Sequence, residues 1–143
     1  MEKTDWMKIL EYQYELHHFS RTLLAAGQKQ TLTVSERELL SLLYLKPEEN
    51  TPLALSKSSG MKKEAVSRCI KKLCEEGFIE KKKSEADERS FLLSLTEKGN
   101  LVLAQNYEII LKPLYELRRK MGSDFDSLFD FIRTANQLSE NKE

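Results

Sequence analysis

The segment from about residue 62 to residue 76 constrains the fold most, because its apolar and charged residues occupy opposite sides of a helical wheel. One narrow arc of the wheel predicts a single buried stripe: Val66, Cys69, Ile70 and Leu73. The opposite arc predicts an exposed, mostly charged face: Glu64, Ser67, Arg68, Lys71, Lys72 and Glu75. Such a helix packs one side against a core and presents the other to solvent or to a charged partner.

A short helix precedes this segment, and the break between the two is tight. Thr51 followed by Pro52 predicts the N-cap and the first residue of the short helix, and Ser59–Gly60 predicts its end. Two helices joined by a short glycine-containing turn, the second with a basic outer face, are typical of a helix-turn-helix. The second helix of that motif enters the major groove of DNA, which is about 12 Å wide.

A β-hairpin is expected directly after the amphipathic helix. Residues 78–84 form one strand candidate, residues 85–88 form a charged turn, and residues 90–95 alternate between apolar and polar side chains. Such a hairpin makes the motif a winged helix-turn-helix. Arg89 lies just past the tip, where a lone arginine suits a narrow and strongly negative minor groove.

The charge distribution is uneven although the formal net charge is zero. Residues 57–83 hold nine basic and four acidic side chains, a balance of +5, so the rest of the chain carries −5. A basic block in a neutral chain indicates a face made for an anionic partner. A solvated, lysine-rich helix surface explains the charge alone equally well, so the two interpretations stay open at this point.

Composition narrows the class of protein. The chain has 143 residues, which fits one ordinary domain, and its few glycines and prolines favour a mostly helical fold. We expect no signal peptide and no membrane-spanning helix, and with two cysteines no disulfide framework, so a cytoplasmic location is expected. No nucleophile elbow, phosphate-binding glycine loop or zinc-protease histidine motif occurs, so the sequence predicts neither an enzyme nor a cofactor nor a metal site.

Helices are also predicted on both sides of the winged motif. The first covers about residues 4–26, and the next is expected to begin at a capping box formed by Ser35 and Glu38. A long helix over about residues 97–120 is expected to kink at Pro113, and a last helix follows Ser123.

These features resemble the MarR family of winged helix-turn-helix transcriptional regulators. The matching motifs are Val66-Ser67-Arg68, the stretch Glu75 to Lys81, the wing triplet Asp87-Glu88-Arg89, and Leu95-Thr96-Glu97-Lys98-Gly99. The resemblance implies a mainly α fold with a small β-hairpin wing (α+β) over residues 1–143. It also implies a DNA-binding core at residues 33–96 and dimerisation helices at 1–30 and 97–143.

The residues and the resemblance together define candidate DNA contacts. The basic face and wing strand supply Lys63, Lys71, Lys72, Lys81, Lys82 and Lys83. The resemblance assigns base recognition to Ser67 and Arg68, and implies that Asp87 positions Arg89 in the minor groove. Glu64 departs from the family pattern, and it would repel phosphates unless it accepts from a cytosine amino group.

The sequence thus predicts a homodimeric, ligand-responsive repressor that binds double-stranded DNA at a pseudo-palindromic operator. The alternative is a protein–protein interaction module whose basic face binds an acidic partner. Candidate contacts to a small aromatic or anionic effector are Tyr12, His17, His18 and Tyr44, although most aromatic side chains at such positions are core or dimer contacts. Metal binding by His17 and His18 and thiol sensing by Cys69 or Cys74 are disfavoured by spacing and position.

Overall fold

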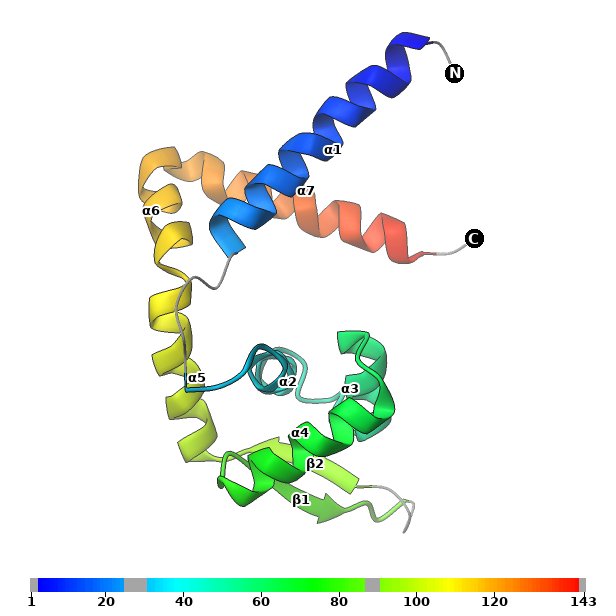
Figure 1. The fold of residues 1–143 in the computed structure, drawn as a ribbon, viewed down its shortest axis with the longest axis vertical. Helices are drawn as coiled ribbons and strands as arrows, with labels where there is room; N and C mark the ends of the chain where they lie inside the picture. The colour runs from blue at the N-terminus through cyan, green and yellow to red at the C-terminus, as the bar shows by residue number, and fades with distance from the viewer. Residues whose placement is uncertain (1–2, 25–30, 87–90, 142–143) are drawn as a thin grey trace. The chain divides into compact units, whose positions relative to one another are not determined.

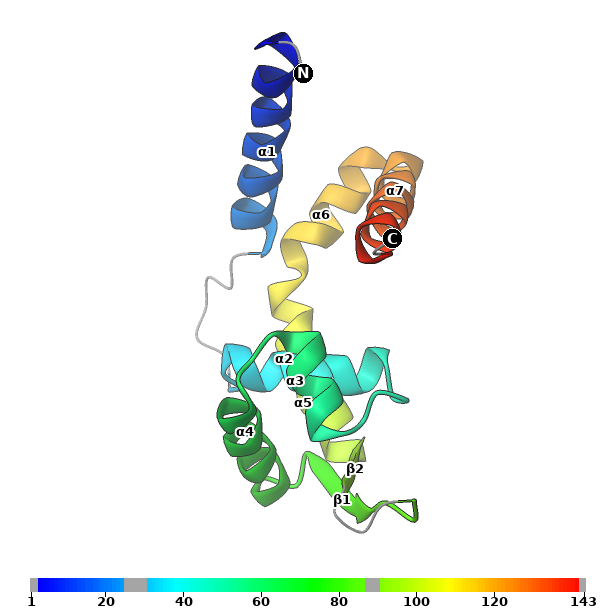
Figure 2. The same ribbon diagram turned by 90° about the vertical axis from the view of Figure 1, so that its right-hand side faces the viewer.

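The computed structural model describes residues 3–24, 31–86 and 91–141. Figures 1 and 2 show its helices and strands in two orientations. In chain order they are α1 (Lys3–Leu24), α2 (Val34–Leu45), α3 (Pro52–Ser59), α4 (Lys63–Glu75), β1 (Ile79–Lys83), β2 (Phe91–Leu95), α5 (Glu97–Ile110), α6 (Lys112–Met121) and α7 (Ser123–Glu140). The predicted class, mainly helical with a small hairpin wing, is confirmed.

The chain divides into two compact units. The winged-helix unit comprises residues 29–109, and the helical unit comprises residues 1–28 and 110–143. Most of α5 therefore belongs with the winged-helix unit, whereas the expected C-terminal dimerisation helices begin at residue 97. The reason is burial, because Leu103 and Asn106 of α5 are buried in the winged-helix unit.

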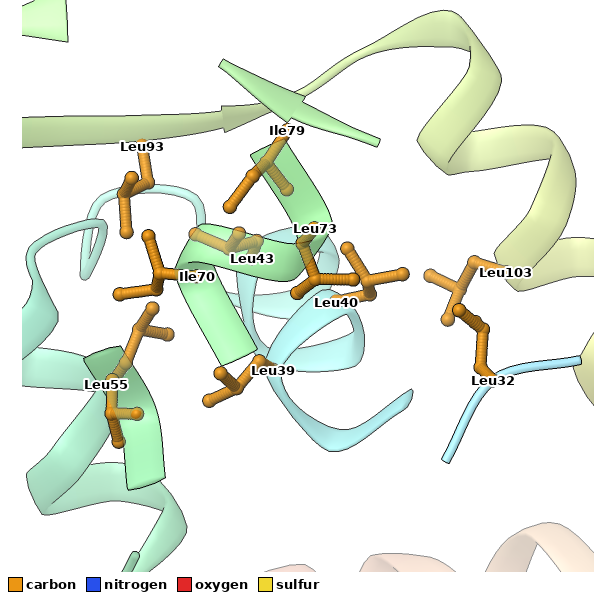
Figure 3. Close-up of a cluster of buried hydrophobic side chains, with 11 residues drawn as sticks. Leu32, Leu39, Leu40, Leu43, Leu55, Ile70, Leu73, Ile79, Leu93 and Leu103 are labelled. Atoms are coloured by element: carbon orange, nitrogen blue, oxygen red, sulfur yellow. The ribbon is translucent and has the colours of Figure 1, made fainter. Parts of the chain in front are cut away.

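One apolar cluster holds the winged-helix unit together. Figure 3 shows side chains from α2, α3, α4, the hairpin and α5 converging on one another. Burying each such Leu, Ile or Val contributes roughly 1.5–3 kcal/mol. The cluster consists of Leu32, Leu39, Leu40, Leu43, Leu55, Val66, Ile70, Leu73, Ile79, Leu93 and Leu103. The stripe predicted on α4 is thus its inner face, with Cys69 partly buried beside it.

Local capping explains where the first two helices of this unit begin. The α3 cap is as predicted, since the Thr51 hydroxyl accepts from the backbone N–H of Ala54 at 3.1 Å. The predicted capping box at Ser35 is wrong. Thr33 is the N-cap of α2, and its hydroxyl accepts from the N–H of Glu36 at 3.2 Å, so the helix starts before Ser35.

The hairpin is fixed in register, and its second strand is bonded to the loop before α3. Ile79 pairs with Leu95 and Lys83 pairs with Phe91 in an antiparallel ladder. On the other edge of β2, the N–H of Leu93 donates to the carbonyl of Asn50 at 2.8 Å. In Figures 1 and 2 the hairpin lies beside α4, which contacts β1.

Pro113 has a stronger effect than the predicted kink. The helix expected over residues 97–120, with a kink at Pro113, is instead interrupted at Leu111 and forms α5 and α6. Proline lacks a backbone N–H, so it fits the first turn of a helix, where that group needs no partner within the helix. Pro113 accordingly lies in the first turn of α6.

The helical unit contains α1, α6 and α7. Helix α6 packs on α7 and contacts α1, and the rings of Phe125 and Phe129 lie 4.8 Å apart. None of the unit's side chains whose exposure the structure describes is buried. Its large apolar side chains at Ile9, Leu16, Phe131 and Leu138 are more than half exposed.

No helix within residues 3–24, 31–86 and 91–141 combines the length and the apolar character needed to cross a membrane.

Candidate nucleic-acid interface

The outer face of α4 brings together the side chains that the sequence predicted for DNA recognition. The inner stripe holds the helix against the core, and this orientation leaves the opposite side in solvent. All six predicted residues of α4 are exposed: Lys63, Glu64, Ser67, Arg68, Lys71 and Lys72. With four basic and two acidic residues between Lys63 and Glu75, the helix carries a formal charge of +2. The face is therefore basic and exposed, and it belongs to a helix whose inner side packs on the core.

Arg68 and Lys71 are available to an external partner. Within the part of the chain that the structure describes, neither side chain takes part in an ion pair or hydrogen bond. An arginine fork matches the two acceptors on the major-groove edge of guanine, and a lysine suits a phosphate. This geometry permits base recognition by Arg68 and phosphate contact by Lys71.

Lys72 differs from these two residues because it has a partner inside the chain. Its ammonium donates to the carboxylate Oε1 of Glu36 on α2 at 2.8 Å. This hydrogen bond and the negative charge of Glu36 raise the pKa of Lys72 above its ordinary value. Glu36 could not be predicted from the sequence, because nothing local indicates that a residue of α2 is paired with one 36 positions later.

The lysines of the wing strand divide between the two faces of the hairpin. Side chains alternate along a strand, so Lys81 and Lys83 share a face with Ile79, and Lys82 points to the other face. The Lys81 ammonium lies 5.4 Å from the centre of the Phe91 ring, a cation–π distance that holds it along β2. All three lysines are exposed. The other two predicted wing residues, Asp87 and Arg89, lie outside the described residues.

The Leu-Thr-Glu-Lys-Gly motif fixes the carboxyl end of α4. The Thr96 hydroxyl donates to the Gly77 carbonyl at 2.6 Å and accepts from the Gly99 N–H at 3.0 Å. Gly99 is required by space, because an added Cβ would overlap the carbonyl oxygen of Phe78. The Lys98 ammonium donates to the carbonyl of Glu76 at 2.8 Å, next to the last turn of α4. This motif is therefore part of the support of the recognition helix.

The two cysteines of α4 are only partly exposed. Burial is the main cause that raises the pKa of the Cys69 thiol, with Glu36 adding to the effect, and burial also raises the pKa of Cys74. Both groups are therefore thiols rather than thiolates near neutral pH, and thiols react slowly with oxidants. These environments favour a packing role for both side chains.

Two of the four predicted effector residues line one cavity. Tyr12 and His18 line a cavity of about 590 Å³ within the helical unit. His17 does not line it, and Tyr44 is an exposed residue of α2 in the other unit. The rest of the cavity wall is mostly apolar and consists of Glu15, Leu16, Phe19, Thr22, Leu23, Leu128 and Ile132.

The neighbour of the His18 ring is an aromatic side chain and not a second metal ligand. The His18 ring stacks on Tyr14 with the ring centres 6.2 Å apart. Across residues 3–24, 31–86 and 91–141, no group of three or more histidine, cysteine or acidic side chains is placed to hold a metal ion.

Solved structures of transcriptional regulators share this fold. The chain is similar to the regulator BldR from Sulfolobus solfataricus, with 18% identity and a TM-score of 0.66 over 96% of this chain and 99% of that one. It is also similar to a cysteine-to-serine mutant of MarR from E. coli complexed with operator DNA, with 18% identity and a TM-score of 0.59 over 90% and 94% of the two chains. The chain thus has the winged-helix fold of these MarR-type structures, as the sequence motifs predicted.

Sequence comparison identifies the family of the chain. The family model described as transcriptional regulator SarA/Rot matches residues 23–105. The chain belongs to this family of transcriptional regulators, so it is a regulator rather than an enzyme. It is also 29% identical over 119 residues to the organic hydroperoxide resistance transcriptional regulator of Bacillus subtilis (strain 168), covering 80% of this chain and 68% of that protein.

Proposed function

We propose that the chain is a homodimeric repressor that acts in the cytoplasm on a pseudo-palindromic operator in double-stranded DNA. The observation that carries this proposal is the outer face of α4, which is basic, exposed and held on a buried apolar stripe. A protein with a similar fold has been crystallised with operator DNA, which supports the same use of the fold here.

The roles of the individual side chains follow from their chemistry. Ser67 and Arg68 contact base edges in the major groove, while Lys63, Lys71 and the wing-strand lysines contact phosphates. Glu64 either accepts from a cytosine amino group or lowers affinity for other sequences. At the wing tip, Asp87 positions Arg89 and Arg89 enters the minor groove.

The dimer is proposed because the helical unit lacks a core of its own. Its apolar side chains on α1 and α7 are exposed in the single chain, and a second copy would bury both sets at once by two-fold symmetry. A symmetric dimer that contacts two successive major grooves places its recognition helices roughly 34–36 Å apart. The operator half-sites are then centred about 10 bp apart.

An effector is proposed for the cavity of the helical unit. Tyr12, His18 and Thr22 offer hydrogen-bonding groups along a mostly apolar wall, which suits a small aromatic molecule. The carboxylate of Glu15 also lines the cavity and would repel an anion, so a neutral aromatic molecule is favoured over an anionic one. Phenol is a suitable probe, with benzoate as the anionic comparison. Thermal stabilisation by phenol, lost in Tyr12→Phe, would support this site, and the absence of any shift would contradict it.

The decisive experiment selects bound duplexes from a random-sequence pool with the wild-type chain and measures the mass of the complex. The proposal expects an enriched inverted repeat bound by two protomers, and repression of a reporter placed behind that sequence. The alternative is an interaction module for acidic proteins. It predicts no enriched sequence, and it predicts that an acidic polypeptide displaces bound DNA more effectively than unrelated duplex does.

A further inference from the structure

The ion pair between Glu36 and Lys72 joins α2 to the recognition helix. Glu36 lies in the first turn of α2, where the positive end of the helix dipole favours a carboxylate. Its side chain is only 5% exposed, whereas that of Lys72 is 54% exposed. The partly exposed Lys72 side chain therefore places its ammonium group against a buried carboxylate.

A buried carboxylate without a partner is costly, so the lysine is not free to leave. Removing one member of such a pair leaves an uncompensated charge, which destabilises a protein far more than an exposed pair stabilises it. Within the described residues, Lys72 is the side chain that donates to Glu36. If the Lys72 ammonium moved to a DNA phosphate, the buried Glu36 carboxylate would lose this hydrogen-bond donor.

The pair adds a directional contact to a helix that is otherwise held mostly by apolar packing. The stripe of Val66, Ile70 and Leu73 keeps α4 against the core, but dispersion and hydrophobic contacts have little preference for one rotation of the helix over a slightly different one. Lys72 follows Arg68 by four residues, so the two side chains lie on the same side of α4. A contact that restricts rotation of α4 at Lys72 therefore also restricts where the Cα–Cβ bond of Arg68 points.

We propose that Glu36 is a positioning residue for DNA recognition, and that Lys72 orients the recognition helix through Glu36 instead of contacting a phosphate. This inference rests on the proposed function, since it names what sets the specificity of the same surface. It separates Lys72 from its neighbour Lys71, which has no such partner among the described side chains.

The test compares Lys72→Met with Lys71→Met, adjacent residues of equal charge on one helix. Binding is measured across a salt series for two duplexes, the one selected by the wild-type chain and a random one. Lys71→Met should lower the salt slope on both duplexes by about 0.9 per protomer, the value for one lost phosphate contact. Lys72→Met should leave the slope unchanged and lower affinity for the selected duplex alone by about tenfold, comparable to one mismatched base pair.

Three further variants separate a positioning role of the ion pair from a simple loss of folding. Glu36→Gln should also reduce the preference for the selected duplex, because a neutral amide holds the lysine less firmly, and Lys72→Arg should retain it. If Lys72→Met does not fold, the double variant Glu36→Gln/Lys72→Met removes the buried charge and takes its place. A salt slope lowered as in Lys71→Met would overturn the proposal, and so would an unchanged preference in both Glu36→Gln and Lys72→Met.

Failure of the proposed function itself gives a different result. If the wild-type chain selects no duplex, amide hydrogen exchange in α4 tests the positioning role without DNA. Faster exchange in the last turns of α4 in Glu36→Gln, but not in Lys71→Met, would still support it, and equal exchange in both variants would refute it.

Discussion

The winged-helix unit buries eleven apolar side chains in one cluster, whereas in the helical unit none of the side chains with described exposure is buried. The first unit can therefore be stable within a single chain. The second consists of α1, α6 and α7 with their apolar faces in solvent, so its stability depends on what covers those faces. Under the proposed function, recognition and assembly belong to different parts of the chain, so mutations in the two parts should differ in their dependence on protein concentration.

The largest effect is expected in the core of the winged-helix unit. Leu73 is fully buried, so Leu73→Ala should lower the free energy of unfolding by about 2–5 kcal/mol. Because its contacts lie within one chain, the loss should be the same at all protein concentrations. Chemical denaturation at two concentrations checks this, and a loss that shrinks at high concentration would contradict an independent core.

A charge in the helical unit should instead act on assembly. Leu16 is 66% exposed in the single chain, and Leu16→Asp should weaken the dimer by about 2 kcal/mol or more, because the new charge would be buried between copies. Sedimentation measures the dissociation constant, and Glu11→Gln on another side of α1 is the control. An unchanged constant for Leu16→Asp would show that α1 does not face the partner.

A change on the outer face of α4 should affect neither folding nor assembly. Arg68→Ala should weaken binding to the selected duplex by about 1–3 kcal/mol and affect random DNA much less, because one bidentate base contact is lost. Titration of both duplexes at one salt concentration measures the difference. Equal losses on both would make Arg68 a phosphate contact.

The smallest effect concerns pH and the Glu36–Lys72 ion pair. The pKa of Lys72 is raised in the folded chain from its ordinary value of 10.5, so the pair stabilises the fold fully below that pH and the contribution is lost as pH rises above it. The free energy of unfolding of the wild-type chain should therefore fall more steeply above pH 10.5 than that of Lys72→Met. Lys71→Met should follow the wild type, and parallel curves for all three would exclude the pair as a source of stability.

Features set by neighbouring residues could be predicted from the sequence. The stripe on α4, the Thr51 cap and the hairpin depend on periodicity or on contacts within a few positions, and the structure has all three. The resemblance of the wing and of the Leu-Thr-Glu-Lys-Gly motif then indicated the class of regulator.

Features set by distant residues could not be predicted in this way. The pairing of Glu36 with Lys72 joins positions far apart in the chain. From the sequence alone, Lys72 was predicted to be a DNA contact like Lys71. Similarly, Asn106 accepts from the N–H of Leu32 and donates to the Thr31 hydroxyl, which ties the start of α2 to α5. The N-cap of α2 is Thr33 rather than Ser35. Both residues carry a hydroxyl group that can cap a helix, and the contacts of Asn106 with Thr31 and Leu32 cannot be read from the local sequence.

The lysines of β1 also affect how copies of this chain behave in a crowded solution. The sheet has two strands, and β2 donates a hydrogen bond to Asn50 on its outer side, while β1 has no further strand beside it among the described residues. An open strand edge offers a template on which another chain can add a strand and start an aggregate. Three successive lysines make that addition costly, since two such edges would bring six positive charges together. Replacing them to weaken DNA binding would therefore also remove a protection against self-association, and such variants should be compared for solubility before their affinities are compared.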